Sequence, residues 1–184
     1  MKIIKKLLFT GVVLFSTLTV SYGQISFSHS LGGSVYLSEN VSAPGILYSP
    51  RLNFLELGDE ITVSVGTHLG LGFSLNADSQ GGGSGSFALD LPVVAEINFG
   101  QGANPDTQSS FGGFAGLGFG ISKMGASDAM GDGYNDAAGV VINGGLRAII
   151  RDKAVGLRVS YLLNIKKDNS SVLGVGLFYT FGDF

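Results

Sequence analysis

Side chains that could carry acid–base or nucleophilic chemistry are scarce in this 184-residue chain, which has two histidines and no cysteine. A hydrolase would need a serine, a histidine and an acid within hydrogen-bond reach. His29 directly precedes Ser30, but consecutive side chains of a β-strand point to opposite faces. His68 has candidate acids but no distinctive serine motif. We therefore predict that the protein is not an enzyme and holds neither a metal nor a cofactor.

Five charged residues inside the alternating segments share one register. Segments with a period of two place alternate side chains on opposite faces, and these charges fall on the small, polar face together with His68, Asn143 and Asn164. The charged members are Arg51, Asp90, Glu96, Arg147 and Arg158. Because charges removed from water must pair, the sequence predicts a salt-bridge network of these five residues in an enclosed lumen.

The elements that would position these residues are strands. From Ile61 to Leu75 the odd positions are apolar, apart from Thr67, and the even positions are small or polar. The same alternation predicts eight strands, over residues 25–37, 46–57, 61–75, 87–99, 111–122, 138–150, 155–165 and 171–181. Hairpin-like connections join them into an antiparallel up-and-down sheet, and closure into a barrel removes its exposed edges.

The composition of the polar face indicates which face meets water. A soluble barrel carries charges on its outer face, but charged residues are only 14% of this chain, against about 25% in ordinary soluble domains. Small residues suit the crowded interior of an eight-stranded barrel, and the charge-free apolar face suits lipid. The predicted fold class is all-β: an eight-stranded antiparallel up-and-down transmembrane β-barrel.

The first 23 residues have the three-part organisation of a secretory signal peptide. Three lysines fall in the first six residues, the apolar run Leu7–Val20 follows, and Ser21 and Gly23 supply small residues before the cleavage point. The run is shorter than the ~20 residues of a spanning helix. We expect cleavage after residue 23 and a barrel domain over residues 24–184. The formal net charge of −3 gives no basic field for nucleic acid.

The final strand carries the most specific motif. Gly176, Tyr179 and Phe181 follow the order glycine, two residues, an aromatic, one residue, a final aromatic. With this ending, residues 24–184 resemble the small eight-stranded outer-membrane β-barrel family of OmpA and OmpX type. Gly174 replaces the family's usual polar residue, and three residues follow the expected end. The resemblance implies a C-terminal insertion signal read by the barrel-assembly machinery.

The same resemblance implies the location of the protein. We expect it in the bacterial outer membrane, among outer-membrane lipids, with both termini in the periplasm. The Gly/Ser-rich segment 76–86 and the Gly/Asp-rich segment 123–137 are then predicted to be long extracellular loops that could bind an extracellular ligand.

The turns predict which interior residues face one another. A two-residue turn at Gly58–Asp59 places Arg51 opposite Gly66. A loop over 76–86 places Gly66 opposite Glu96. Both pairings keep inner residues opposite inner residues. Arg51 and Glu96 should then form a buried bridge across the short glycine.

A turn around Asp152–Lys153 similarly predicts that Arg147 lies opposite Arg158. Two adjacent guanidinium groups need an acid, and Glu96 lies at a similar depth. We therefore expect Glu96 to be shared among Arg51, Arg147 and Arg158.

Three roles follow from this interpretation. The first is a structural, adhesive or loop-mediated binding role in the cell envelope, with the lumen plugged by polar side chains. The second is a narrow, porin-like channel for small solutes. The third is a soluble β-barrel that binds an apolar ligand.

Overall fold

A computed structural model describes residues 25–39, 41–77, 83–104, 107–128, 131–151 and 153–182. The predicted signal peptide, residues 1–23, lies outside the described residues. The described residues form nine strands: β1 (Ser26–Ser38), β2 (Val41–Glu56), β3 (Ile61–Thr67), β4 (Leu69–Ala77), β5 (Gly83–Gly100), β6 (Phe111–Asp128), β7 (Gly131–Ile150), β8 (Lys153–Asn164) and β9 (Val172–Gly182). The described residues contain no helix that is long and apolar enough to cross a membrane.

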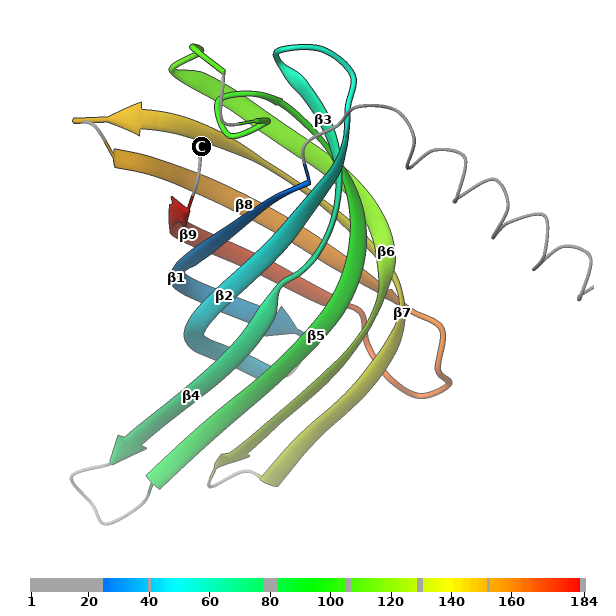
Figure 1. Cartoon of the computed structure of the whole chain (residues 1–184). Helices are drawn as coiled ribbons and strands as arrows, with labels where there is room; N and C mark the ends of the chain where they lie inside the picture. The colour runs from blue at the N-terminus through cyan, green and yellow to red at the C-terminus, as the bar shows by residue number, and fades with distance from the viewer. Residues whose placement is uncertain are drawn as a thin grey trace, which may run out of the picture.

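The strands form a closed antiparallel ring (Figure 1). β1 pairs with β2 on one side and with β9 on the other, so the sheet has no free edge along this seam. β3 and β4 together act as a single strand of the wall, because each pairs with β2 on one side and with β5 on the other. The ring therefore has eight wall positions in up-and-down order, which confirms the predicted fold class.

The division between β3 and β4 at His68 has a local cause. The β2 register pairs Tyr48 with Leu69 and Arg51 with Gly66, so Pro50 faces the break from one side. Pro92 of β5 lies on the other side, one residue before Val93, which pairs with Thr67. Proline has no N–H to donate to a ladder. The wall therefore loses regular hydrogen bonding on both flanks of His68.

The alternation of faces is as the sequence predicts. On β4 the outward side chains Leu71 and Phe73 are 56% and 66% exposed. Inward side chains such as Ser64, Asn98 and Glu96 are at most 2% exposed. The soluble-barrel alternative required an apolar interior and a charged exterior. It is wrong because large apolar side chains cover the exterior, while Arg51, Asp90, Glu96, Arg147 and Arg158 are buried in the interior beside a separate apolar cluster.

Two of the predicted registers are wrong by two residues. Glu96 lies opposite Ser64, and Gly66 lies opposite Val94, because Leu75 pairs with Gly85 instead of Phe87, which centres the β4–β5 hairpin one residue earlier than expected. Gly145 lies opposite Arg158, and Arg147 opposite Gly156. In the β7–β8 hairpin Ile150 pairs with Lys153, so the turn comes one residue earlier than the predicted turn at Asp152–Lys153. Arg151 in this turn has a φ of 50°.

The predicted pairing of Arg51 with Gly66 is confirmed, but the two-residue turn from which it was predicted is not present. The turn does not pair Leu57 with Glu60, because the Leu57 amide donates to the Ile61 carbonyl at 2.8 Å. A bulge between Asn53 and Leu55 adds one residue to β2. The turn is one residue longer than expected and the bulge adds one residue to β2. The two changes cancel, so beyond the bulge β2 and β3 pair in the expected register.

The predicted long loops 76–86 and 123–137 are largely strand. β4 and β5 remain paired out to Ala77 and Gly83, and β6 and β7 remain paired out to Asp128 and Gly131. The two hairpins project at the end opposite the C-terminus (Figure 1). Backbone ladders to neighbouring strands override the weak strand propensity of these glycine-rich segments.

Candidate functional site

Glu96 occupies the middle of the barrel interior. Its Oε1 accepts a hydrogen bond from Asn143 Nδ2 at 2.6 Å and lies 3.4 Å from Arg158 Nη2. The His68 Nε2 atom is 3.5 Å from the same oxygen and 3.0 Å from Asn143 Nδ2. Strands β5, β7 and β8 and the β3–β4 break thus direct four polar side chains to one point.

Arg158 links this cluster to the opposite wall. Its Nη1 donates to Ser49 Oγ at 2.9 Å and contacts His68 Nδ1. Its guanidinium carbon lies 4.8 Å above the Phe114 ring, within the range of a cation–π interaction. Arg158 therefore has a carboxylate, a hydroxyl and an aromatic face as partners.

Arg51 and Arg147 have a different environment, because they share one carbonyl oxygen. Arg51 Nη2 donates to the Gly102 carbonyl at 2.6 Å, and Arg147 Nη1 donates to it at 3.3 Å. Arg51 Nη1 also donates to Asn98 Oδ1 at 2.6 Å, and Arg147 lies 4.4 Å above Phe114. Within the described residues neither guanidinium has a carboxylate within 4.0 Å.

The predicted direct bridge between Arg51 and Glu96 is therefore wrong. Glu96 pairs with Arg158, and Arg51 bonds to Asn98 and to Gly102. The two-residue register shift of β5 accounts for this result. It places Val94, rather than Glu96, in the row of Arg51 and Gly66. The Arg51 side chain then extends past Glu96 to Asn98, which lies four residues beyond Val94 on β5.

The remaining predicted interior residues lie apart from this cluster. Asp90 is 7% exposed and, within the described residues, has no cation within 4.0 Å. Asn164 is at the barrel rim, where its Nδ2 donates to the carbonyls of Lys166 and Asn169 at 2.8 and 2.7 Å. Asn164 thus orders the β8–β9 turn rather than the lumen.

The loop after β5 closes the barrel mouth at the end where β1 begins and β9 ends. Residues 101–104 turn inward and are all buried, with φ values of 61° at Gly100 and 73° at Gly102, a conformation that favours glycine. Asn104 Nδ2 donates to the Asp59 carbonyl at 2.7 Å, which anchors the loop to the β2–β3 turn. The sequence predicts a long turn over residues 100–110, but not that residues 101–104, the mouth loop, fold into the lumen.

Two cavities inside the barrel are each about 10 Å³. One is lined by residues of the Arg51–Glu96–Arg158 region, and the other lies near Tyr36 and Asp90. A cavity of 10–15 Å³ has space for about one water molecule. The interior is thus occupied by side chains and the mouth loop.

Neither histidine forms a catalytic arrangement in the described part of the chain. His68 contacts Asn143, Arg158 and Glu96, and no serine hydroxyl hydrogen-bonds to it. His29 Nδ1 is 3.3 Å from the hydroxyl of Tyr48 on the outer face. The absence of enzymatic activity stays a prediction.

The outer wall has an aromatic cluster at the C-terminal end. The rings of Tyr179 and Phe181 are stacked with centroids 6.1 Å apart, and the His29 ring is 4.1 Å from Phe181. Phe181 faces β1 in the closing seam through its pairing with His29. Gly176 pairs with Ser34. The assembly role of Gly176, Tyr179 and Phe181 stays a prediction.

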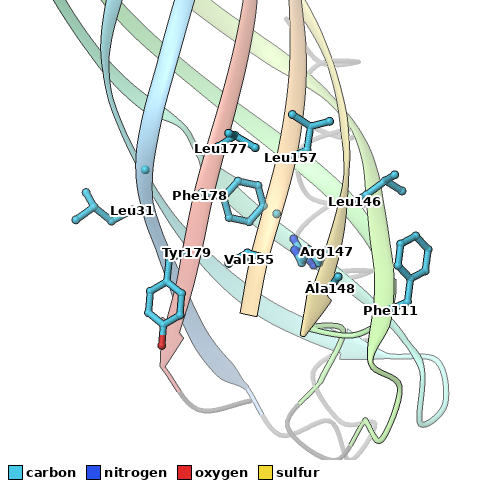
Figure 2. Close-up of a pocket in the computed structure, with 12 residues that line it drawn as sticks. Leu31, Phe111, Leu146, Arg147, Ala148, Val155, Leu157, Leu177, Phe178 and Tyr179 are labelled. Atoms are coloured by element: carbon cyan, nitrogen blue, oxygen red, sulfur yellow. The ribbon is translucent and has the colours of Figure 1, made fainter. Parts of the chain in front are cut away.

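The same wall has an apolar groove of about 590 Å³. Figure 2 shows Leu31, Phe111 and Tyr179 projecting away from the strands that border it. Gly32 and Gly156 are also part of its lining. The groove belongs to the continuous apolar exterior.

Comparisons with known proteins identify the class of fold. No family model matches the chain, and no curated protein matches it significantly. Among solved structures, Ail, the attachment invasion locus protein of Yersinia pestis, matches with a TM-score of 0.52 at 13% identity, over 85% of this chain and 97% of that one. Ail in complex with the heparin analogue sucrose octasulfate matches with a TM-score of 0.51 at 16% identity, over the same shares of both chains.

A third structure, neisserial surface protein A, has a TM-score of 0.48 at 13% identity, over 88% of this chain and 98% of that one. At these identities the comparisons establish the fold alone. The chain has the fold of the small eight-stranded outer-membrane β-barrels, as its resemblance to the OmpA and OmpX type implied.

Proposed function

We propose that this protein is an outer-membrane barrel with a sealed lumen that acts through its projecting hairpins, in adhesion or in binding at the cell surface. The single observation that supports it best is the distribution of polarity. Large apolar side chains cover the exterior. The interior is filled by the charged cluster, by the mouth loop and by a separate cluster of buried apolar side chains that includes Tyr36, Val94 and Met124. Lipid stabilises such an exterior, whereas water would not. An interior with cavities of about 10 Å³ supports a scaffold rather than a pore.

The hairpins supply a surface suited to binding. A groove of about 410 Å³ lies between β4, β5, β6 and β7 and is lined by Phe73, Phe87 and Tyr134, among others. Tyr134 is 62% exposed and Phe73 66%. Exposed aromatic side chains that line a groove are typical of interaction sites. The fold shared with Ail, a protein named for attachment, supports the adhesive form of the proposal.

Hairpin truncation tests the binding role. Residues 76–84 and 126–133 are each replaced by a two-residue Asn-Gly turn, which joins the pairs Leu75–Gly85 and Gly125–Tyr134 without changing the register. The same variant carries alanine at Phe73, Phe87 and Tyr134, because these groove residues would otherwise remain. Bacteria displaying the intact barrel should adhere to host cells, and those displaying equal amounts of the truncated barrel should not. Equal adhesion by the two would contradict the proposal.

Planar-bilayer recordings of the refolded protein test the sealed lumen. We expect no stepwise conductance from the intact barrel. A variant whose mouth loop is replaced by a two-residue turn is the matched positive control. Steady ion-conducting steps from the intact barrel would instead favour the narrow channel.

A further inference from the structure

Where its three buried arginines lie, the barrel interior holds more positive than negative charge. Arg51, Arg147 and Arg158 are each at most 6% exposed, and Glu96 is the carboxylate that contacts one of them. Arg51 and Arg147 converge on the neutral Gly102 carbonyl. Their Nη atoms are therefore no further apart than the sum of those two hydrogen-bond lengths. Two buried cations this close require a compensating negative charge.

Hydrogen-bond donors in the same place lack acceptors. The Nε atoms of Arg51, Arg147 and Arg158 are buried and have no hydrogen-bond partner among the residues that the structure describes. For Arg147 the one hydrogen bond found within the described residues is the long contact to Gly102. Buried donors of this kind are normally satisfied, so this region is short of acceptors as well as of negative charge.

A cavity of about 10 Å³ lies against these groups. Its lining includes all three arginines, the hydroxyl-bearing residues Ser28, Ser30, Ser49 and Thr67, and also His68 and the carboxylate Glu96. The three guanidinium groups still exceed this one carboxylate by two charges. Guanidinium N–H and hydroxyl O–H groups are the donors that an anion accepts from. The volume suits one species of about the size of a water molecule, which excludes phosphate, sulfate and organic carboxylates.

We propose that the cavity between Arg51, Arg147 and the β1–β2 serines binds a single halide-sized anion, chloride under physiological conditions. The anion takes the place of the carboxylate that Arg51 and Arg147 lack. The Gly102 carbonyl holds the two guanidinium groups from the mouth side, so the anion lies on their serine side. Chloride then forms part of the interior packing that keeps the mouth loop in place.

Stability measurements on the refolded protein in detergent provide the first test. Unfolding by urea is compared in sodium chloride and in sodium gluconate at equal ionic strength. A ligand that binds only the folded state shifts the folding equilibrium in proportion to its concentration once it exceeds the dissociation constant. In that range the folding constant should rise about tenfold for each tenfold increase in chloride, and gluconate should have no such effect.

Arg147→Gln should abolish the difference between chloride and gluconate. Lys153→Gln, which removes an exposed cation, is the matched control and should preserve it. Crystals of the unsubstituted protein grown in bromide provide a test that does not require a variant to fold. We expect an anomalous peak within hydrogen-bond distance of Arg51 or Arg147. The absence of that peak, equal stability in the two salts, or a chloride effect that survives in Arg147→Gln would each overturn the proposal.

Discussion

Glu96→Gln is the substitution with the largest expected effect on stability. It keeps the side-chain volume but removes the carboxylate that contacts Arg158 at 3.4 Å and accepts from Asn143 at 2.6 Å. Breaking a buried ion pair by removing one partner costs roughly 3–5 kcal/mol. Because Glu96 is only 2% exposed, water cannot replace the lost charge. We expect the free energy of unfolding to fall by about that amount.

A double-mutant cycle identifies the partner of Glu96. Glu96→Gln combined with Arg158→Gln should cost less than the two single substitutions together, by about 0.5–3 kcal/mol. The combination with Arg51→Gln should show a smaller coupling, because Arg51 bonds to Asn98 and Gly102 instead.

The assay is urea unfolding of the protein refolded into lipid vesicles. The chain has no tryptophan, so circular dichroism and heat-modifiable electrophoretic mobility replace indole fluorescence. A cost of Glu96→Gln below about 0.5 kcal/mol, within the range of ordinary surface substitutions, would refute the reasoning. An Arg51 coupling equal to that of Arg158 would refute the assigned geometry.

Three further predictions concern the exterior and the rim. Leu71 lies on the outer face and is 56% exposed, so Leu71→Arg should destabilise the membrane-inserted barrel by roughly 2–4 kcal/mol. Recovery of the unsubstituted protein in a soluble periplasmic fraction would contradict its membrane location. Tyr179→Ala with Phe181→Ala should stall outer-membrane assembly after normal export, and a normal amount of heat-modifiable barrel would argue against the insertion signal. Lys166 Nζ forms an ion pair with Asp136 Oδ1 at 2.8 Å and lowers the pKa of that carboxyl. The pair therefore stabilises the fold above the ordinary carboxyl pKa, and this stabilisation is lost as the pH falls through the lowered value. Lys166→Gln should raise the Asp136 pKa in an NMR titration, and an unchanged titration would exclude the pairing.

The strands and their faces could be predicted because a period of two is a local property of the sequence. The segment from Ile61 to Leu75 shows this, since its outward and inward residues alternate as expected. Even there, the break at His68 depends on Pro50 and Pro92, which lie on the two neighbouring strands. A pattern within one strand does not contain that information.

The interior contacts were harder to predict because they depend on register, and register depends on the turns. Segment 76–86 has the composition of a loop, yet most of it is paired strand. Its pairing centres the β4–β5 hairpin one residue earlier than expected, so the position opposite Glu96 on β3 shifts by two residues. Glu96 then contacts Arg158 instead of Arg51. The mouth loop has no strong sequence signal, although the shortage of acids beside Arg51 and Arg147 indicates that acceptors must come from elsewhere.

The seam between β1 and β9 determines when the wall can close. Ser30 and Thr180, whose hydroxyls are 3.0 Å apart in this seam, are separated by 150 positions in sequence. The other strands pair with near neighbours along the chain and can form hairpin by hairpin, whereas this contact carries the full loop-closure entropy of the chain. Until it forms, β1 and β9 both present open edges that can pair with other chains. The barrel thus remains prone to aggregation until its last strand has been delivered, so the C-terminal residues control how long the unfinished chain is at risk.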